Sequence, residues 1–148
     1  MDINLPPEAI AVHTDHRGKG LQRKLARAHL VLAEDLGYHH ILCTVSPKNP
    51  KSLSNMLSCG FRIEVLRPKF LRWIRFILHK DLKKFHLSSA RDADGRAGQI
   101  AISISDLEGK QILLESGFKG FKIEAQYGII KVLYEKSRQM NENDPIPD

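Results

Sequence analysis

Four residues near the start of the chain have the types and spacing of a phosphate-binding turn: Arg17, Gly18, Lys19 and Gly20. They follow a short apolar stretch and open a long amphipathic segment. A strand that leads through a glycine turn into a helix leaves backbone N–H groups free to hold an anionic phosphate. By itself such a turn is a weak motif, so the residues around it have to be weighed with it.

The charge order of the segment after the turn strengthens this interpretation. Helices favour acids in the first turn and bases in the last, because the macrodipole is positive at the N-terminus. Here Glu34 and Asp35 lie near the end, and the start carries four cations, Arg17, Lys19, Arg23 and Lys24. This inverted order is unfavourable unless an anion binds, which indicates a phosphate-rich ligand. The alternative is a solvated basic face with no ligand.

Composition bounds the class of protein. The 148 residues are enough for one core, and 42% hydrophobic with 27% charged residues is typical of a folded globular chain. The net charge of +6 favours an anionic partner, which could be a nucleotide cofactor, RNA or a membrane surface.

The cysteines and the apolar runs indicate where the protein works. Cys43 and Cys59 are too few for a disulfide framework and lack metal-ligand spacing, so a reducing compartment is expected. No signal-like stretch is present, and Arg72 and Arg75 interrupt the most apolar run, residues 70–78. These features argue against secretion and membrane spanning and predict a cytoplasmic protein.

The first elements have the pattern of a βαβ unit. A short strand is expected over 9–13 and a buried strand over 40–45, whose β-branched content suits it. Between them, apolar residues at helical spacing predict a helix that ends at Gly37: Leu21, Leu25, Ala28, Leu32 and Leu36. The two strands should therefore be parallel, with the glycine turn at the carboxyl end of the first.

A short helix and a hairpin should follow. Asn49 and Pro50 are a helix N-cap and first position, and Gly60 stops the helix. Two strands are expected over 61–66 and 73–79, joined by a basic turn at 67–69.

The second half begins after the clearest linker in the sequence, residues 88–98. We expect residues 1–87 to form the core that carries the ligand turn, and residues 137–148 to be a disordered tail. Residues 99–136 are expected to form a βαββ segment, with strands over 99–103, 118–125 and 129–134 and a helix over 106–116. The pentapeptide that starts at Gly60 is also similar to the one that starts at Gly120, and the similarity could be a repeat or generic αββ patterning.

Two stretches resemble the motifs of a known family. Residues 12–22 resemble motif A of the GNAT superfamily of acetyl-CoA-dependent N-acyltransferases, with Arg17, Gly20 and Gln22 at its defining places, although Gln22 stands where a small residue is usual. Residues 49–52, together with the Gly60 and Phe61 pair, resemble motif B. The two motifs occur in the family's order, with the expected strand between them, and cover residues 9–79.

The resemblance implies an α/β fold: a GNAT-like mixed twisted sheet with a central βαβ unit and helices packed on it. It implies that acetyl-CoA is the co-substrate, that no metal is used, and that an amine on a small molecule or peptide is the acceptor. The implied cofactor-binding residues are Ile10, Ala11, Val12, Arg17, Gly18, Lys19, Gly20, Leu21, Gln22, Arg23, Asn49, Ser52 and Asn55.

The catalytic residues are not identified by the motifs. The family often has a tyrosine that protonates the departing thiolate, and Met56 stands at that place here; Tyr38, Ser52 and Asn55 are nearby alternatives. The strands and helices that usually precede motif A are also missing. The chain could therefore be a truncated form, residues 99–136 could complete the sheet or swap into a partner, or a homodimer could supply the missing part.

Other constellations favour simpler interpretations. His13 and His16 flank Asp15, yet a surface or capping role is favoured over a metal or base role. Glu8 and Glu64 could act as a base through water, although solvated strand positions are the simpler interpretation.

The basic and aromatic run 67–76 could bind nucleic acid, but its alternation favours a core strand. The sequence thus predicts an N-acetyltransferase. The alternatives are a non-catalytic acyl-CoA-binding domain and, less favoured, a basic nucleic-acid-associated protein.

Overall fold

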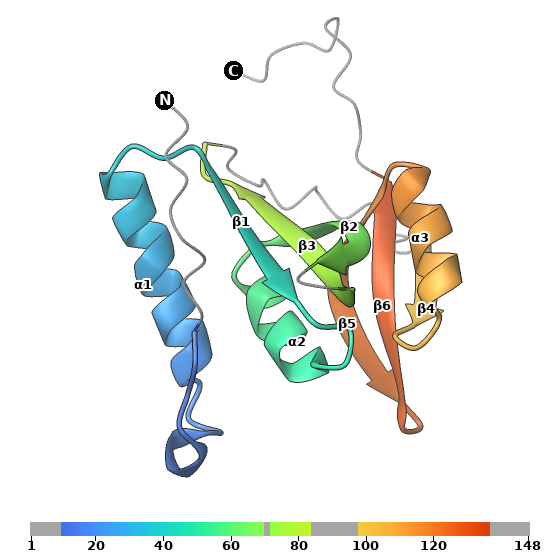
Figure 1. The fold of residues 1–148 in the computed structure, drawn as a ribbon, viewed down its shortest axis with the longest axis horizontal. Helices are drawn as coiled ribbons and strands as arrows, with labels where there is room; N and C mark the ends of the chain where they lie inside the picture. The colour runs from blue at the N-terminus through green and yellow to red at the C-terminus, as the bar shows by residue number, and fades with distance from the viewer. Residues whose placement is uncertain (1–9, 70–71, 84–97, 137–148) are drawn as a thin grey trace, which may run out of the picture.

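The structure is a computed structural model that describes residues 10–69, 72–83 and 98–136. It is an α/β fold, as predicted, with a single twisted sheet and helices packed on it (Figure 1). In chain order the elements are η1 (Thr14–His16), α1 (Leu21–Asp35), β1 (His40–Val45), α2 (Pro50–Ser58), β2 (Arg62–Lys69), β3 (Trp73–Asp81), β4 (Gln99–Ser103), α3 (Leu107–Glu115), β5 (Phe118–Gln126) and β6 (Ile129–Lys136). None of the described helices has both the length and the hydropathy needed to span a bilayer.

The predicted parallel pair is wrong. The six strands lie in the order β1-β3-β2-β5-β6-β4, and every described pairing is antiparallel. Residues 10–13 form no strand, and Ala11 and Val12 line an open pocket together with Leu21 and Leu25 of α1. The βαβ unit is therefore absent, and β1 is an edge strand of the described sheet, with the side chain of Leu42 exposed.

The strand order contains a repeat. From each edge inward, the order is β1-β3-β2 on one side and β4-β6-β5 on the other, and each half is a β-α-β-β unit. Since β2 and β5 are antiparallel neighbours, an approximate two-fold axis between them exchanges the halves. We call residues 40–81 the first unit and residues 99–136 the second unit.

Matching details show that this similarity is more than generic patterning. The helices have equal length, an Asn49 or Asp106 side chain caps each start, and Gly60 or Gly117 with positive φ follows each end. Each unit also has a β-bulge, between Ile63 and Val65 in the first and between Gly120 and Lys122 in the second.

The same shift in residue number, from the first unit to the second, aligns all of these features. This shift aligns Gly60-Phe61-Arg62 with Gly117-Phe118-Lys119. The similar pentapeptide that begins at Gly120 is therefore displaced by three residues from the structural repeat.

The two units share one core on the helix face of the sheet. It includes Leu53, Ile63, Phe76 and Leu78 from the first unit and Val132 from the second. Helix α2 packs on β5 and α3 packs on β2, so each helix crosses the boundary between the units (Figure 1). We call the β2–β5 boundary the seam.

The seam has little backbone pairing. Its ladder contains one residue pair, Ile63 with Gly120. A Cβ atom on Gly120 would lie 2.7 Å from Cδ1 of Ile63, so the glycine allows the close approach. The units are therefore joined by side-chain packing more than by hydrogen bonds.

Helix α1 lies outside this arrangement. It buries Ala26, Leu30 and Ala33 and packs on α2, while Leu25 and Leu32 of the apolar stripe that predicted the helix are exposed. Periodicity identified the helix correctly, but no described element covers that stripe.

Candidate functional site

The turn before α1 is built on two left-handed glycines. Gly18 has φ of +79° and Gly20 has φ of +70°, a region that side-chain-bearing residues rarely adopt. Gly20 is the N-cap of α1 and makes no side-chain capping hydrogen bond. The predicted glycine turn and helix start are confirmed.

The first backbone donors of α1 lie at this turn and have no acceptor among the described residues. The first bond that closes the helix runs from the Lys24 N–H to the Gly20 carbonyl. The N–H groups of Leu21, Gln22 and Arg23 precede it, so helix geometry leaves them free. They form a short row of donors at the positive end of the helix dipole.

Exposed cations surround these donors. Lys19, Arg23 and Lys24 are exposed, and the first turn of α1 contains no acid. Arg17 donates from Nε to the Val12 carbonyl at 3.3 Å, which folds the turn back on the segment before it. Among the described residues none of these four cations has an ion pair, so their charge is available to a ligand.

An open pocket of about 380 Å³ adjoins the turn. It is mostly apolar, and its lining consists of Ala11, Val12, His13, His16, Leu21, Lys24 and Leu25. Ile10, the first described residue, is partly buried against the core. The predicted residues 10–12 are thus close to the turn, in an irregular segment and not in a strand.

The other predicted cofactor residues form a bridge between helices. Gln22 donates from Nε2 to Oγ of Ser52 at 2.7 Å and accepts from Nδ2 of Asn55 at 2.8 Å. Asn49 accepts from the Ser52 N–H at 3.1 Å and caps α2. The structure brings Gln22, Ser52 and Asn55 together, where they tie α1 to α2. Gln22, the departure from motif A, has this structural role.

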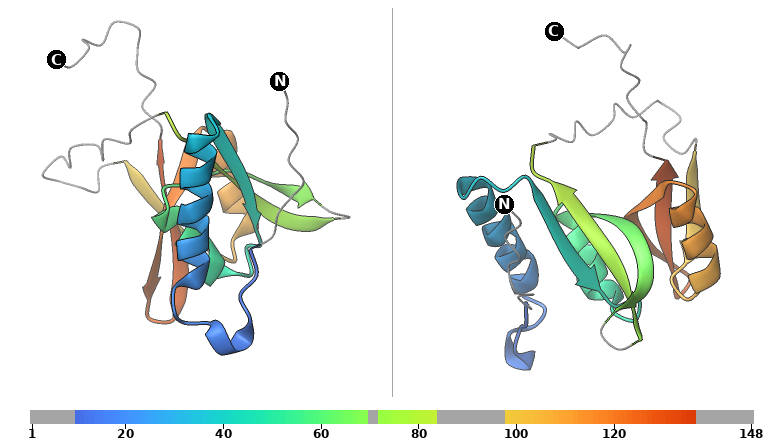
Figure 2. Two further views of the ribbon diagram at one scale, coloured as in Figure 1. Left: turned by 90° about the vertical axis from the view of Figure 1, so that its left-hand side faces the viewer. Right: turned by 45° about the horizontal axis from the view of Figure 1, so that its top comes forward.

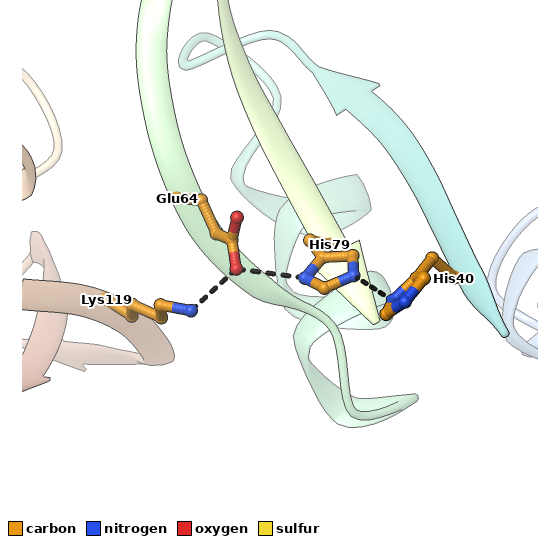
Figure 3. Close-up of polar contacts among 4 residues, drawn as sticks. All are labelled: His40, Glu64, His79 and Lys119. Carbon is orange, nitrogen blue, oxygen red and sulfur yellow. Dashed lines mark hydrogen bonds and ion pairs between the residues drawn. The ribbon is translucent and has the colours of Figure 1, made fainter. Parts of the chain in front are cut away.

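A second polar cluster lies on the sheet, and the sequence did not predict it as a unit. Lys119 donates to Oε1 of Glu64 at 2.7 Å, and Nδ1 of His79 lies 3.0 Å from the same oxygen. Nε2 of His79 is 3.0 Å from Nδ1 of His40. Figure 3 shows the four side chains in a continuous chain across β5, β2, β3 and β1. We call it the Glu64 chain.

Charge and tautomer follow from this geometry. Burial raises the pKa of Glu64, but hydrogen bonds from Lys119 and His79, with their charges, outweigh it and leave that pKa below its ordinary value. The carboxylate therefore only accepts, so Nδ1 of His79 donates to it. The other ring nitrogen of His79, Nε2, is left to contact the exposed ring of His40.

The Glu64 chain is separate from the glycine turn. His40 is the first residue of β1, and the strand runs about 17 Å from there to its end at Val45, which leads to α2. Of the four residues of the Glu64 chain, the sequence suggested only Glu64 as a base. The other three are distant from it in sequence, and only strand pairing brings them together. Glu8, the other acid considered, lies outside the described residues.

The remaining candidates are placed as follows. Met56 is buried in the core, so the family's tyrosine position has a packing role here. His13 caps η1 by accepting from the Asp15 N–H at 3.4 Å, and no described cluster of three or more His, Cys, Asp or Glu has the geometry to hold a metal. Burial raises the pKa of Cys43 to about 12, so its thiol stays protonated at neutral pH.

Comparison with known proteins gives three similarities. The model of the Acetyltransferase (GNAT) family matches residues 8–61. The L-amino acid N-acyltransferase MnaT of Escherichia coli (strain K12) is 37% identical over 70 residues, which cover 45% of this chain and 41% of MnaT. The structure of yncA from Salmonella typhimurium with its cofactor acetyl-CoA matches with a TM-score of 0.46 and 29% identity, over 55% of this chain and 50% of that one.

The matched family segment begins before the glycine turn and ends after α2, so it contains every described residue of the turn and of the bridge. The chain spans less than half the length of the curated relative that it matches. The second unit, β4 to β6, lies beyond the matched family segment.

Proposed function

Because residues 8–61 match the model of the Acetyltransferase (GNAT) family, we propose that the glycine turn binds the pyrophosphate of acetyl-CoA and that the protein transfers the acetyl group to an amine. The observation that carries the proposal is the row of free N–H groups at Leu21, Gln22 and Arg23, flanked by exposed cations that have no ion pair among the described residues. Charge-assisted hydrogen bonds to a pyrophosphate would use these donors together, and the inverted charge order of α1 then has a physical reason.

The pocket beside the turn fits the less polar part of such a co-substrate. Its apolar lining adjoins the cationic rim at Lys24, so one ligand with a charged end and an apolar arm could contact both. We propose that Ile10, Ala11 and Val12 line the arm and that Asn49, Ser52 and Asn55 contact it from α2. The last two would have to exchange part of their bonds to Gln22 for bonds to the ligand.

Acyl transfer requires few groups beyond correct positioning. The neutral amine attacks the thioester carbonyl, the new C–N bond forms as the C–S bond breaks, the amine loses a proton and the thiolate gains one. Proximity of the two reactants supplies a large part of the rate. The described residues offer Tyr38, Ser52 or Asn55 as partners for the leaving thiolate, since Met56 cannot donate a proton.

We further propose that the acceptor is a small amine of the L-amino acid class. The relative that matches this chain at 37% identity is named as an L-amino acid N-acyltransferase. The match covers less than half of the chain, so the acceptor is the part of the proposal that most needs a direct test.

A non-catalytic acyl-CoA-binding domain is the second candidate. The buried Met56 at the tyrosine position favours it, because the usual proton donor is missing. Isothermal titration with acetyl-CoA tests both functions, and an absence of binding at millimolar concentration would exclude both. Release of free thiol in the presence of a panel of L-amino acids, peptides and simple amines then separates an enzyme from a binder.

The homodimer and the cytoplasmic location stay predictions. Leu25 and Leu32 form an exposed apolar stripe on α1, where a second copy would find a surface to cover. Light scattering of the purified chain over a hundredfold concentration range measures the oligomeric state directly.

A further inference from the structure

The outer end of the β2–β3 hairpin is rich in cations. Arg67, Lys69, Arg72 and Arg75 lie on it, and the sequence from 65 to 78 contains no acid. The hairpin reaches out beyond the end of β1 (Figure 2, left). Phe76 pairs with Val45, the last residue of β1, so Arg75 lies one residue past the end of that strand.

Two of these cations are forced together. Arg67 and Arg75 are direct cross-strand partners, so their side chains leave the hairpin on the same face. Like charges in this position destabilise a sheet, by about 0.2–1 kcal/mol. Among the described residues neither arginine has an acidic partner to offset the repulsion.

Trp73, an exposed aromatic residue of the hairpin, lies against one of the two guanidinium groups. The guanidinium carbon of Arg75 lies 5.4 Å from the ring centroid of Trp73, which is 64% exposed. Nε of Arg75 is buried and has no hydrogen-bond partner among the described residues. A positioned guanidinium that lacks an acceptor is suited to bind a planar oxyanion through two parallel N–H bonds.

We propose that Arg67 and Arg75 bind the carboxylate of the amine acceptor, with Trp73 packing against the acceptor's side chain. This inference rests on the proposed acyl transfer and names the group by which the acceptor is recognised. Arg75 lies near the end of β1, and the chain continues from that end to Asn49, a predicted cofactor residue. The pair is on the sheet face opposite the core residue Phe76, so the acceptor would approach from the face that α2 does not cover.

Trp73 is the only tryptophan of the chain, so its fluorescence reports on this site without any need for catalysis. The full-length protein is titrated with L-leucine and, separately, with L-leucinamide, which lacks the carboxylate, at matched ionic strength in sodium chloride. We expect a saturable change with L-leucine and none with L-leucinamide over the same range. Arg67→Gln and Arg75→Gln should each weaken L-leucine binding at least tenfold.

Two further variants separate recognition from a general effect of charge or packing. Lys122→Gln removes an exposed cation of β5 and should bind L-leucine like the unmodified protein. Arg75→Lys keeps the charge but loses the planar fork, so its affinity should fall between that of the unmodified protein and that of Arg75→Gln. No saturable change with L-leucine, or equal binding after both arginines are replaced, would overturn the proposal.

Activity measurements distinguish this inference from the function on which it rests. If acetyl transfer occurs and Arg75→Gln leaves the KM ratio of L-leucine to L-leucinamide unchanged, the carboxylate site is wrong and the proposed function stands. If Trp73 reports L-leucine binding but no acetyl transfer or acetyl-CoA binding is found, the site stands and the proposed function is wrong. Tight binding of a single-stranded oligonucleotide that L-leucine does not compete for would overturn the carboxylate site and assign the arginines to nucleic acid instead.

Discussion

Replacing Gly20 by aspartate should remove acetyl-CoA binding without unfolding the protein, and asparagine is the matched control. Both side chains adopt left-handed backbone more readily than most, and both incur a similar conformational cost of about 1–2 kcal/mol. A Cβ at this position would meet only Nη2 of Arg23, at 3.8 Å, so there is room for either side chain. The two variants therefore differ chiefly in one negative charge.

That charge acts on binding in two ways. It repels the pyrophosphate, and it offers Arg23 a carboxylate that competes for the guanidinium. Two unit charges a few ångströms apart near a protein surface interact by about 1–4 kcal/mol. We expect Gly20→Asp to lose about 2–3 kcal/mol of binding free energy relative to Gly20→Asn, a weakening of about 30- to 150-fold.

The assay is isothermal titration of both variants with acetyl-CoA at low and at moderate salt, with urea unfolding to compare their stabilities. The difference in affinity should shrink as salt screens the charges, and Gly20→Asp should be at least as stable as Gly20→Asn, because a carboxylate at this helix start offsets the cations there. If Gly20→Asp binds acetyl-CoA within about threefold of Gly20→Asn, the pyrophosphate does not lie at this turn and the site assignment fails.

Three further predictions concern polar groups of the sheet and of α3. Lys119 and His79 outweigh burial and lower the pKa of Glu64 in the folded state. The ionised Glu64 carboxylate therefore stabilises the fold above its unfolded-state pKa, and this stabilisation is lost as pH falls through the folded-state pKa. Between pH 6 and pH 3 the unfolding free energy should drop more than that of Glu64→Gln, by up to about 1 kcal/mol. Burial lowers the pKa of Lys110 to about 8, so stability should rise by about 1–3 kcal/mol between pH 8 and pH 10.5, and urea titrations of Lys110→Met should show no such rise. The buried hydroxyl of Tyr134 has no hydrogen-bond partner among the described residues, so Tyr134→Phe should be neutral or stabilise by about 1 kcal/mol in thermal unfolding, and a loss above about 1 kcal/mol would show that the hydroxyl is bonded.

Local signals predicted the elements well because their causes are local. Asn49 and Pro50 marked the start of α2, Gly60 marked its end, and strand 40–45 was found with its observed bounds. The glycine turn and the donors of α1 were predicted for the same reason, since helix-start geometry depends on a few consecutive residues.

What the sequence did not reveal depends on partners that are distant along the chain. Strand 40–45 was expected to be buried, yet Leu42 is exposed because it lies on the sheet face opposite the core, which Ile41 and Cys43 contact. Residues 67–69 were expected to form a turn but continue β2, with Pro68 opposite Ile74 of β3 and beyond the part of the strand that pairs with β5. The Glu64 chain and the Arg67–Arg75 pair likewise arise from strand register, which composition and spacing do not specify.

The two units of the repeat differ in their core residues and at their helix starts. The alignment places Lys110 where the first unit has Leu53, and the strand pairing places Tyr134, opposite Gly120, where the first unit has Leu78, opposite Ile63, so two polar groups occupy core positions of the second unit. At the helix start, Asp106 and Gly109 stand where the first unit has Asn49 and Ser52, so an acid replaces a neutral amide at the cap. The second unit therefore lacks the features that favour an anionic ligand in the first.

The seam should respond to cold differently from the hairpins on either side of it. Its single ladder pair, Ile63 with Gly120, leaves the contact of α2 with β5 and of α3 with β2 as the main attraction between the units. Attraction that depends on apolar burial weakens on cooling, whereas the antiparallel hydrogen bonds within β2–β3 and β5–β6 do not depend on it in the same way. Near the freezing point, amide hydrogens along the seam should exchange with solvent earlier than those inside either hairpin, because low temperature separates the two units at the seam.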